Sequence, residues 1–278
     1  MRFGVYVPNF RSYADPRRLA DLARQAEAAG WDGIFIWDHM WMSLGLGPGQ
    51  PVADPWVALA AIATATERLR LGPMVTPVAR RRPWKLAREL VTLDHLCGGR
   101  VIFGVGLGMP IEEYEAFGES ADARTRAHRL DEGLEILAGL LSGQPFSFEG
   151  GQFRLREVHF GPSPVQKRIP VWVGGNWPAK PPFRRAARWD GVMPISAHGF
   201  PAVEDVAQAA AYVREHRRSN GPYDVVVCGM TRSAMETAPV TAMREVGATW
   251  WLESFHDDLM PYDAAVDRIA QGPPRLAG

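Results

Sequence analysis

The chain has little cysteine, no net charge and no long apolar run. Its 278 residues include two cysteines, Cys97 and Cys228, which are far apart and form no CxxC pair, so we expect no disulfide framework. Lys+Arg and Asp+Glu both number 31, a formal net charge of +0, which disfavours nucleic acid or an anionic membrane as the main partner. No run reaches the roughly 18 apolar residues of a membrane span, and Met1–Pro8 reads as a strand, not a signal peptide. We therefore expect a cytoplasmic protein.

Also missing is a phosphate-binding GxGxxG or P-loop after the first predicted strand, which disfavours an open doubly wound sheet. What the sequence does contain is a regular alternation of short apolar runs and helical patterns. Strands are predicted at 3–7, 33–37, 70–76, 101–105, 169–173, 191–195, 223–228 and 248–252. Helices are predicted at 15–29, 54–66, 83–97, 122–141, 178–188, 201–218, 231–246 and 262–270. Eight such units predict an α/β fold, a single (β/α)8 TIM-barrel domain over residues 1–278.

Three features add to this alternation. Residues 144–160 carry aromatic residues on both sides of a Glu149-Gly150-Gly151 turn and predict a small β-hairpin insertion. The glycine-rich stretch Leu44–Pro51 is either a plain connector or a lid. Several tryptophans adjoin predicted strand ends, either as core packing or as an aromatic-walled pocket. They are Trp37, Trp41, Trp172, Trp177, Trp250 and Trp251.

The chemistry of a TIM barrel lies where its strands end at the C-terminal face. The second predicted strand ends in Trp37-Asp38-His39, an adjacent carboxylate and imidazole. Because imidazole ordinarily titrates near neutrality, His39 is the best candidate for a general acid or base, with Asp38 beside it. A histidine that merely packs there is the alternative. No His-x-His pair and no second cluster of ligands appear at another strand end, so no metal site is predicted.

Glycines and arginines follow other strands. Gly104-Val105-Gly106-Leu107-Gly108 ends the fourth strand, where glycines either turn the chain or permit close approach of a planar ring. Gly174-Gly175-Asn176 follows the fifth and is either a phosphate cradle before a helix or a tight turn. Arg80-Arg81-Arg82 follows the third and is either solvated or able to pair with an anionic ligand tail.

Taken in order, these segments resemble the luciferase-like monooxygenase superfamily, and more closely its branch that uses deazaflavin F420. The resemblance is close over about residues 1–195 and loose beyond them. The matching segments are Gln25–Asp32, Trp37-Asp38-His39, Leu71-Gly72, Val75-Thr76-Pro77, Leu93-Asp94-His95, Gly99-Arg100-Val101, Gly104–Gly108, Glu112-Glu113-Tyr114, Phe117-Gly118, Leu130-Asp131-Glu132, Pro170–Gly175 and Arg188–Gly191.

The resemblance implies a cofactor ring over the end of the third strand, with a bulge or a non-prolyl cis peptide near Met74-Val75. It implies that His39 exchanges a proton beside the ring, that Asp38 lies near the ring edge, and that Gly174 and Gly175 hold the cofactor phosphate. The full implied binding set is Asp38, His39, Met74, Val75, Thr76, Gly106, Gly108, Gly174, Gly175 and Asn176. It also implies a homodimer. Met109-Pro110 replaces an acid that some sugar-oxidising relatives carry, which disfavours that substrate class.

Three functions follow from this resemblance and these residues. The first is an F420-dependent oxidoreductase that transfers a hydride between F420 and a small organic substrate, with His39 managing the proton. The second is an FMN-dependent luciferase-like monooxygenase. The third is a flavin- or F420-binding protein without turnover, which the Asp38-His39 pair disfavours. The sequence identifies neither the substrate nor the direction of hydride transfer.

Overall fold

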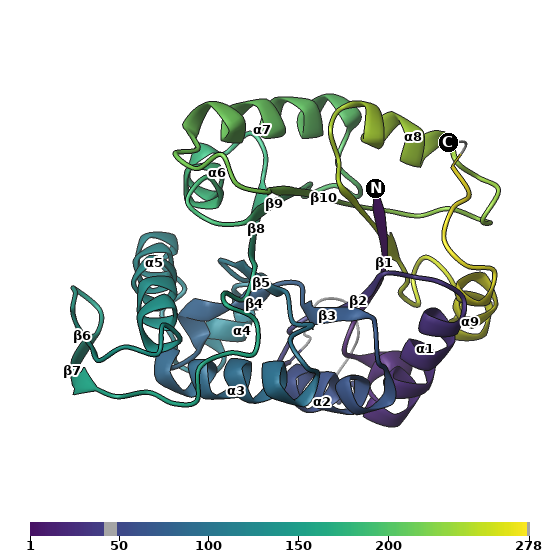
Figure 1. The fold of residues 1–278 in the computed structure, drawn as a ribbon. Helices are drawn as coiled ribbons and strands as arrows, with labels where there is room; N and C mark the ends of the chain where they lie inside the picture. The colour runs from purple at the N-terminus through teal and green to yellow at the C-terminus, as the bar shows by residue number, and fades with distance from the viewer. Residues whose placement is uncertain (42–48, 277–278) are drawn as a thin grey trace.

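A ring of parallel strands surrounded by helices is the main feature of the computed structural model, which describes residues 1–41 and 49–276 (Figure 1). The strands of the ring are β1 (Arg2–Val7), β2 (Gly33–Ile36), β3 (Arg70–Pro73), β4 (Thr76–Pro77), β5 (Phe103–Gly106), β8 (Val171–Asn176), β9 (Gly191–Ile195), β10 (Asp224–Gly229) and β11 (Trp250–Ser254). They pair in the order β3-β2-β1-β11-β10-β9-β8-β5-β4, and β3 and β4 are two pieces of one predicted strand. A parallel bridge from Leu71 in β3 to Val101, just before β5, closes the ring. The predicted TIM-barrel fold is confirmed.

Helices pack around the outside of this ring. The longer ones are α1 (Pro16–Ala28), α2 (Pro55–Ala65), α3 (Pro83–Leu96), α5 (Ala123–Leu140), α6 (Lys180–Ala186), α7 (Val203–His216), α8 (Ala238–Glu245) and α9 (Tyr262–Ala270); α4 (Glu112–Glu115), η1 (Arg11–Tyr13) and η2 (Val78–Arg80) are short. Asp15 and Asp54 cap α1 and α2 by accepting backbone N–H bonds, and a proline follows each, as the sequence predicts. Within the described ranges, none of these helices has the length and hydropathy that crossing a membrane requires.

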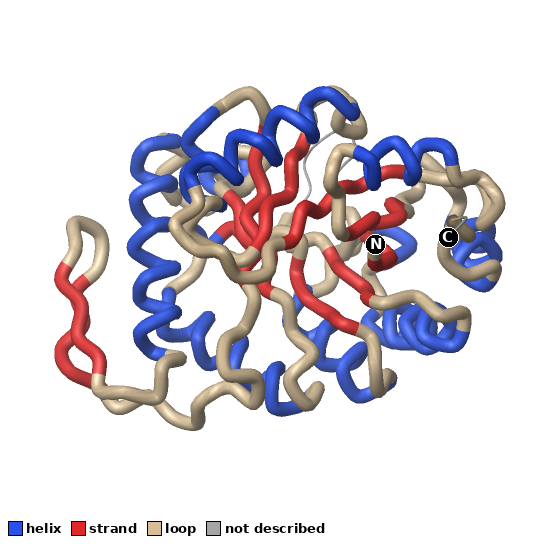
Figure 2. The backbone as a smooth tube through the Cα atoms, turned by 45° about the horizontal axis from the view of Figure 1, so that its top comes forward, coloured by secondary structure: helices blue, strands red, loops and turns tan. Residues whose placement is uncertain are grey.

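The predicted hairpin is present as β6 (Phe146–Glu149) and β7 (Arg154–Val158), which pair antiparallel. It extends away from the barrel beyond α5 (Figure 2). Residues 44–48 of the predicted Leu44–Pro51 loop lie outside the described residues.

Large aromatic side chains fill the barrel interior. Phe35, Trp172 and Trp250 are fully buried, with ring centroids 5.2–5.7 Å apart. Trp251 is buried as well. Because a closed barrel of eight strands is packed with side chains, these tryptophans are core residues. Of the tryptophans at strand ends, Trp37 lies at the mouth of the barrel and Trp41 is exposed.

Two predicted elements differ from the structure. The third strand is interrupted at Met74-Val75, where the peptide bond is cis, as the resemblance implies. The helix predicted at 231–246 begins only at Ala238, because Thr231 is tied down elsewhere. Its backbone N–H and hydroxyl donate to the buried carboxylate of Glu253, and Arg268 donates to its hydroxyl and carbonyl oxygens, so a side chain and not a helical N–H pairs with this carbonyl.

Candidate active site

A cavity of about 240 Å³ opens at the C-terminal mouth of the barrel. It lies between the ends of β2 and β4 and the start of α2, so it occupies the face where barrel enzymes hold their chemistry. Its lining residues are Asp38, His39, Met40, Val52, Ala53, Asp54, Pro55, Arg80 and Arg81. The two residues that the sequence singles out for proton transfer therefore share one cavity.

His39 is fixed through both its backbone and its ring. The side chain of Asn9, at the end of β1, donates to the carbonyl oxygen of His39 at 2.7 Å and accepts from its N–H at 3.2 Å. Nδ1 of the imidazole lies 3.3 Å from Oε1 of Glu113. Since an ionised carboxylate only accepts hydrogen bonds, Nδ1 carries the proton of a neutral His39 and Nε2 has the free lone pair. This arrangement suits an imidazole that exchanges a proton through Nε2.

Glu113, in α4, is a buried acid that connects two strand ends. The same Oε1 accepts the backbone N–H groups of Met40 and Trp41 at 3.0 and 2.9 Å, and Oε2 pairs with Arg80. Burial by itself would raise the pKa of Glu113. The hydrogen bond and charge of His39 and the charge of Arg80 outweigh that effect, so its pKa lies below its ordinary value. Glu113 is therefore an ionised anchor for the His39 loop.

Asp38 is only 3% exposed, and its carboxylate is fully occupied by other protein groups. Arg80 and Arg81 donate to Oδ1 at 3.0 and 2.9 Å, Arg81 also donates to Oδ2 at 3.0 Å, and the hydroxyl of Thr76 donates to Oδ2 at 2.7 Å. With these four hydrogen bonds, the side chain holds β2, β4 and the following turn together. A buried carboxylate so paired is a positioning group.

The three consecutive arginines differ in their burial and in their partners. Arg80 and Arg81 are held in ion pairs with Asp38 and Glu113, with side chains 6% and 19% exposed. Arg82 is exposed and lies over the ring of Trp84, 5.9 Å from its centroid. Neither sequence alternative describes Arg80 and Arg81, which are not solvated and are already paired with buried carboxylates, whereas Arg82 is solvated.

Val75 lies among the glycines at three strand ends. A Cβ on Gly106 would be 2.6 Å from Cγ2 of Val75, and one on Gly174 would be 3.0 Å from its Cγ1. The side chain of Met74 points into the barrel core, and its carbonyl oxygen accepts the hydroxyl of Tyr6 at 2.9 Å. The absence of a Cβ on these glycines therefore lets the side chain of Val75 pack directly against the ends of β5 and β8.

The other predicted binding residues are spread along this rim. Gly108, with φ +87°, lies against Tyr114 and Pro77. Gly175 and the exposed Asn176 are the last residues of β8. Gly174 and Gly175 still pair with β9, and α6 begins at Lys180, two residues later than predicted, so the glycines do not form a tight turn into the helix. A side chain at Gly175 would overlap Pro182 of α6, which explains a glycine there by packing alone.

An aromatic wall borders the cavity. The indole of Trp37 contacts the rings of Tyr6, Phe10, His39 and His256, with centroids 5.6–5.8 Å away. Its Nε1–H is buried and has no hydrogen-bond partner in the described part of the chain. Burial lowers the pKa of His256, so its neutral form is favoured against this wall. The unpaired indole N–H is a donor available to a bound group.

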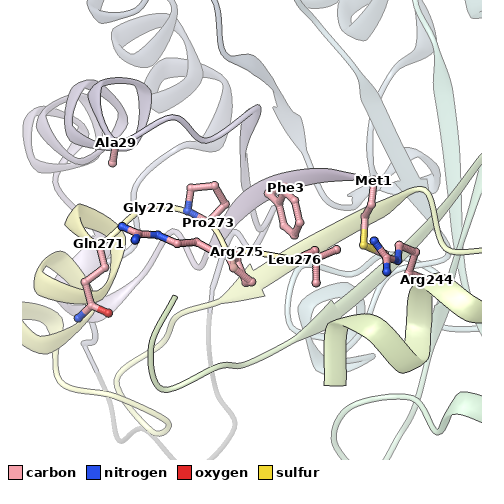
Figure 3. Close-up of a pocket in the computed structure, with 10 residues that line it drawn as sticks. Met1, Phe3, Ala29, Arg244, Gln271, Gly272, Pro273, Arg275 and Leu276 are labelled. Carbon is pink, nitrogen blue, oxygen red and sulfur yellow. The ribbon is translucent and has the colours of Figure 1, made fainter. Parts of the chain in front are cut away.

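A larger cavity, about 510 Å³, lies at the opposite end of the barrel (Figure 3). It is formed by Met1 and Phe3 at the start of β1 and by the chain after α9, from Gln271 to Leu276. Its described lining contains no carboxylate or imidazole, so it lacks a general acid or base. The residues that the structure describes also contain no group of three or more His, Cys, Asp or Glu that could hold a metal ion.

The sequence interpretation gave no role to Glu113, Asn9 or Tyr6. Glu113 belongs to the Glu112-Glu113-Tyr114 segment that resembles the family, and its place in the loop after the fourth strand is the signal that could have assigned it to the mouth. Nothing local in the sequence shows that it meets His39.

Fold and site together define a (β/α)8 barrel with an imidazole–carboxylate pair and an aromatic wall at its C-terminal mouth. A model of the luciferase-like monooxygenase family matches residues 1–271, and the chain belongs to this family. The chain is 33% identical over 180 residues to an F420-dependent glucose-6-phosphate dehydrogenase of Microbacterium testaceum, a match that covers 64% of this chain. It spans about half of that relative, 52% of its length.

Solved structures agree on the fold. The coenzyme F420 dependent tetrahydromethanopterin reductase of Methanopyrus kandleri superposes with a TM-score of 0.77, 17% identity and 98% of both chains covered. The oxygenating constituent of 3,6-diketocamphane monooxygenase from Pseudomonas putida, in complex with FMN, superposes with a TM-score of 0.75, 15% identity and 100% and 99% covered. The expected family is confirmed.

Proposed function

We propose that this protein is an F420-dependent oxidoreductase that acts on a small organic molecule. The observation that carries the proposal is the imidazole of His39, which Glu113 orients at 3.3 Å in a cavity at the barrel mouth. A pure binding protein needs no such oriented proton carrier, and this disfavours a protein without turnover. The named function of relatives about one-third identical to this chain supports F420 as the cofactor.

Two observations test whether the mouth fits a deazaflavin. The side chain of Val75 packs directly on the backbone of Gly106 and Gly174, so the strand ends carry no Cβ there and would present a flat surface to a ring. The buried N–H of Trp37 offers a donor to a polar group of a ligand. The residues present therefore fit the cofactor. Val75, Gly106, Gly108 and Gly174 would border it, with Gly175 and Asn176 at the rim and Met74 and Thr76 supporting the bend beneath.

When bound, F420 supplies a carrier of two electrons and one hydrogen as hydride, so a C–H bond of the substrate is broken or formed. His39 takes up or gives back the accompanying proton at Nε2. Glu113 keeps Nδ1 protonated and stabilises the imidazolium that arises when Nε2 accepts a proton. Asp38, Arg80 and Arg81 hold the loop that carries His39.

We further propose one catalytic domain over residues 1–278, a cytoplasmic location and a homodimer. The two cysteines are unpaired and buried, as suits a reducing compartment.

Exposed apolar side chains on α2 and α3, namely Val57, Trp84 and Leu96, support a subunit contact on these helices. Light scattering of the purified protein tests this: a monomer at micromolar concentration contradicts the dimer.

The cofactor is tested by titrating the purified protein with F420 and, separately, with FMN, at low and high ionic strength. We expect F420 to bind more tightly at both. An unrelated TIM barrel of similar size serves as the control for nonspecific fluorescence changes. Tighter binding of FMN would replace the proposal with the flavin monooxygenase. Tight F420 binding without turnover of any alcohol, aldehyde or enone would favour a binding protein.

A further inference from the structure

The cavity at the N-terminal end of the barrel carries charge of one sign. Two arginines line it, Arg244 in the last turn of α8 and Arg275 after α9, and its described lining contains no carboxylate (Figure 3). Arg275 is exposed, and its guanidinium has no acidic partner within residues 1–41 and 49–276. At the catalytic mouth, in contrast, each lining arginine pairs with a buried carboxylate. A concave surface with cations and no acid attracts an anion.

The rest of this cavity is largely apolar. Met1, Phe3, Ala29 and Leu276 are partly buried side chains that line it and pack against the hydrophobic core. In Figure 3 the side chains of Phe3 and Leu276 lie between the guanidinium group of Arg275 and that of Arg244. The volume of about 510 Å³ is that of a small-molecule site, for which roughly 300–1,000 Å³ is usual. The lining therefore suits a molecule with a charged head and an apolar body.

The segment that carries Arg275 is anchored at both of its ends. The carbonyl oxygen of Gly272 accepts a hydrogen bond from the buried side chain of Arg268 at 2.8 Å. The backbone N–H of Arg275 donates to the carbonyl oxygen of Ala234 at 2.8 Å. The two residues between Gly272 and Arg275 are prolines, whose rings each fix one backbone dihedral. Because this wall is already in place, a ligand has little backbone to order when it binds.

We propose that this cavity is a second binding site, separate from the catalytic mouth, for a small organic anion with an apolar body. The carboxylate or phosphate head pairs with the guanidinium of Arg275, which matches either group with two parallel N–H bonds. The apolar body lies on Phe3 and Leu276. Such a ligand joins the start of β1 to the chain after α9, so its binding stabilises the folded protein. It binds beside the cofactor and does not compete with it, because the two cavities lie at opposite ends of the barrel.

The test measures binding without reference to turnover. The full chain is titrated by calorimetry with acetate, hexanoate, hexyl phosphate and hexanol, and its melting temperature is followed with each. We expect the tighter of hexanoate and hexyl phosphate, which identifies the head group, to bind about tenfold or more tightly than hexanol and to raise the melting temperature. From acetate to hexanoate, affinity should rise roughly two- to fourfold per methylene. Hexanol binding as tightly as both anions, or acetate as tightly as hexanoate, overturns the proposal.

Variants locate the site. Arg275→Gln should fold, because its side chain is exposed, and should weaken binding of the preferred anion about tenfold or more. Arg275→Lys should restore part of that affinity. Arg214→Gln, which removes an exposed arginine of α7, is the matched control and should bind as the wild type does. His39→Ala should also bind the anion normally, and saturating F420 should not displace it. Undiminished affinity in Arg275→Gln, or displacement of the anion by F420, overturns the proposal.

Discussion

Oε1 of Glu113 lies 3.3 Å from Nδ1 of His39, although the two residues are 74 positions apart in the chain. The contact joins the end of β2 to the helix that follows β5. The contact determines which nitrogen of a neutral His39 carries the proton. Because an ionised carboxylate accepts a hydrogen bond from Nδ1–H, Nε2 is left with the free lone pair.

His39→Ala should fold and bind F420 normally but lose roughly 10²–10⁴-fold in turnover, the usual range for a general acid or base. The measurement is steady-state turnover alongside a cofactor titration. His128→Ala, on the exposed face of α5, is the matched control and should retain full activity. Near-normal turnover of a folded His39→Ala variant would remove His39 from the mechanism.

Glu113→Gln should lower turnover less than loss of His39 does. A hydrogen bond to a charged group contributes about 1.5–3 kcal/mol, which corresponds to roughly a ten- to hundredfold loss in rate. A positioning role also predicts a displaced pH–rate profile, since the imidazole loses its anionic partner. An unchanged profile with lower activity would mean that Glu113 acts on folding only.

The same carboxyl predicts how stability depends on pH. Because the pKa of Glu113 is lowered on folding, its ionised form stabilises the native state. This contribution is complete above the unfolded pKa of about 4.3 and is lost as the pH falls through the lower folded value. The difference in unfolding free energy between wild type and Glu113→Gln should therefore shrink below about pH 4. A difference that stays constant from neutral pH to strong acid would contradict this.

Arg80→Gln should destabilise the protein by roughly 3–5 kcal/mol, because it leaves Asp38 and Glu113 buried with less compensation. Arg82→Gln, in the same run but exposed, should change stability by no more than about 0.5 kcal/mol. Urea denaturation of both variants makes the comparison. Equal losses of unfolding free energy in the two variants would show that the buried ion pairs of Arg80 do not stabilise the protein.

Gly174→Ala should mainly weaken cofactor binding, whereas Gly175→Ala should mainly lower stability. A Cβ on Gly174 would come closest to the side chains of Val75 and Ile195, at 3.0 and 3.1 Å, and should push them into the mouth. We expect about tenfold weaker F420 binding with a small loss of stability. On Gly175 it overlaps Pro182, so Gly175→Ala should mainly lower the melting temperature. The reverse pattern would make Gly175, and not Gly174, the residue that admits the cofactor.

Local patterns in the sequence predicted most of the fold. Asp15 and Asp54 cap helices as expected, since capping depends on groups within three residues of each other. The strands were visible as apolar runs because a parallel sheet is buried on both faces. The segment from Thr231 was predicted wrongly as helix, because its partners Glu253 and Arg268 belong to elements far along the chain.

The sequence by itself determined that this chain alternates strand and helix, that His39 stands at a strand end and that glycines follow other strands. Only the tertiary structure decided what these residues do. In the folded chain, the carboxylate of Asp38 pairs with Arg80, Arg81 and Thr76, and Glu113 lies within hydrogen-bond distance of His39. The physical reason is that periodicity and capping involve residues a few positions apart in the chain. A buried charge, in contrast, must be paired, and its partner can come from any segment that the closed barrel places beside it.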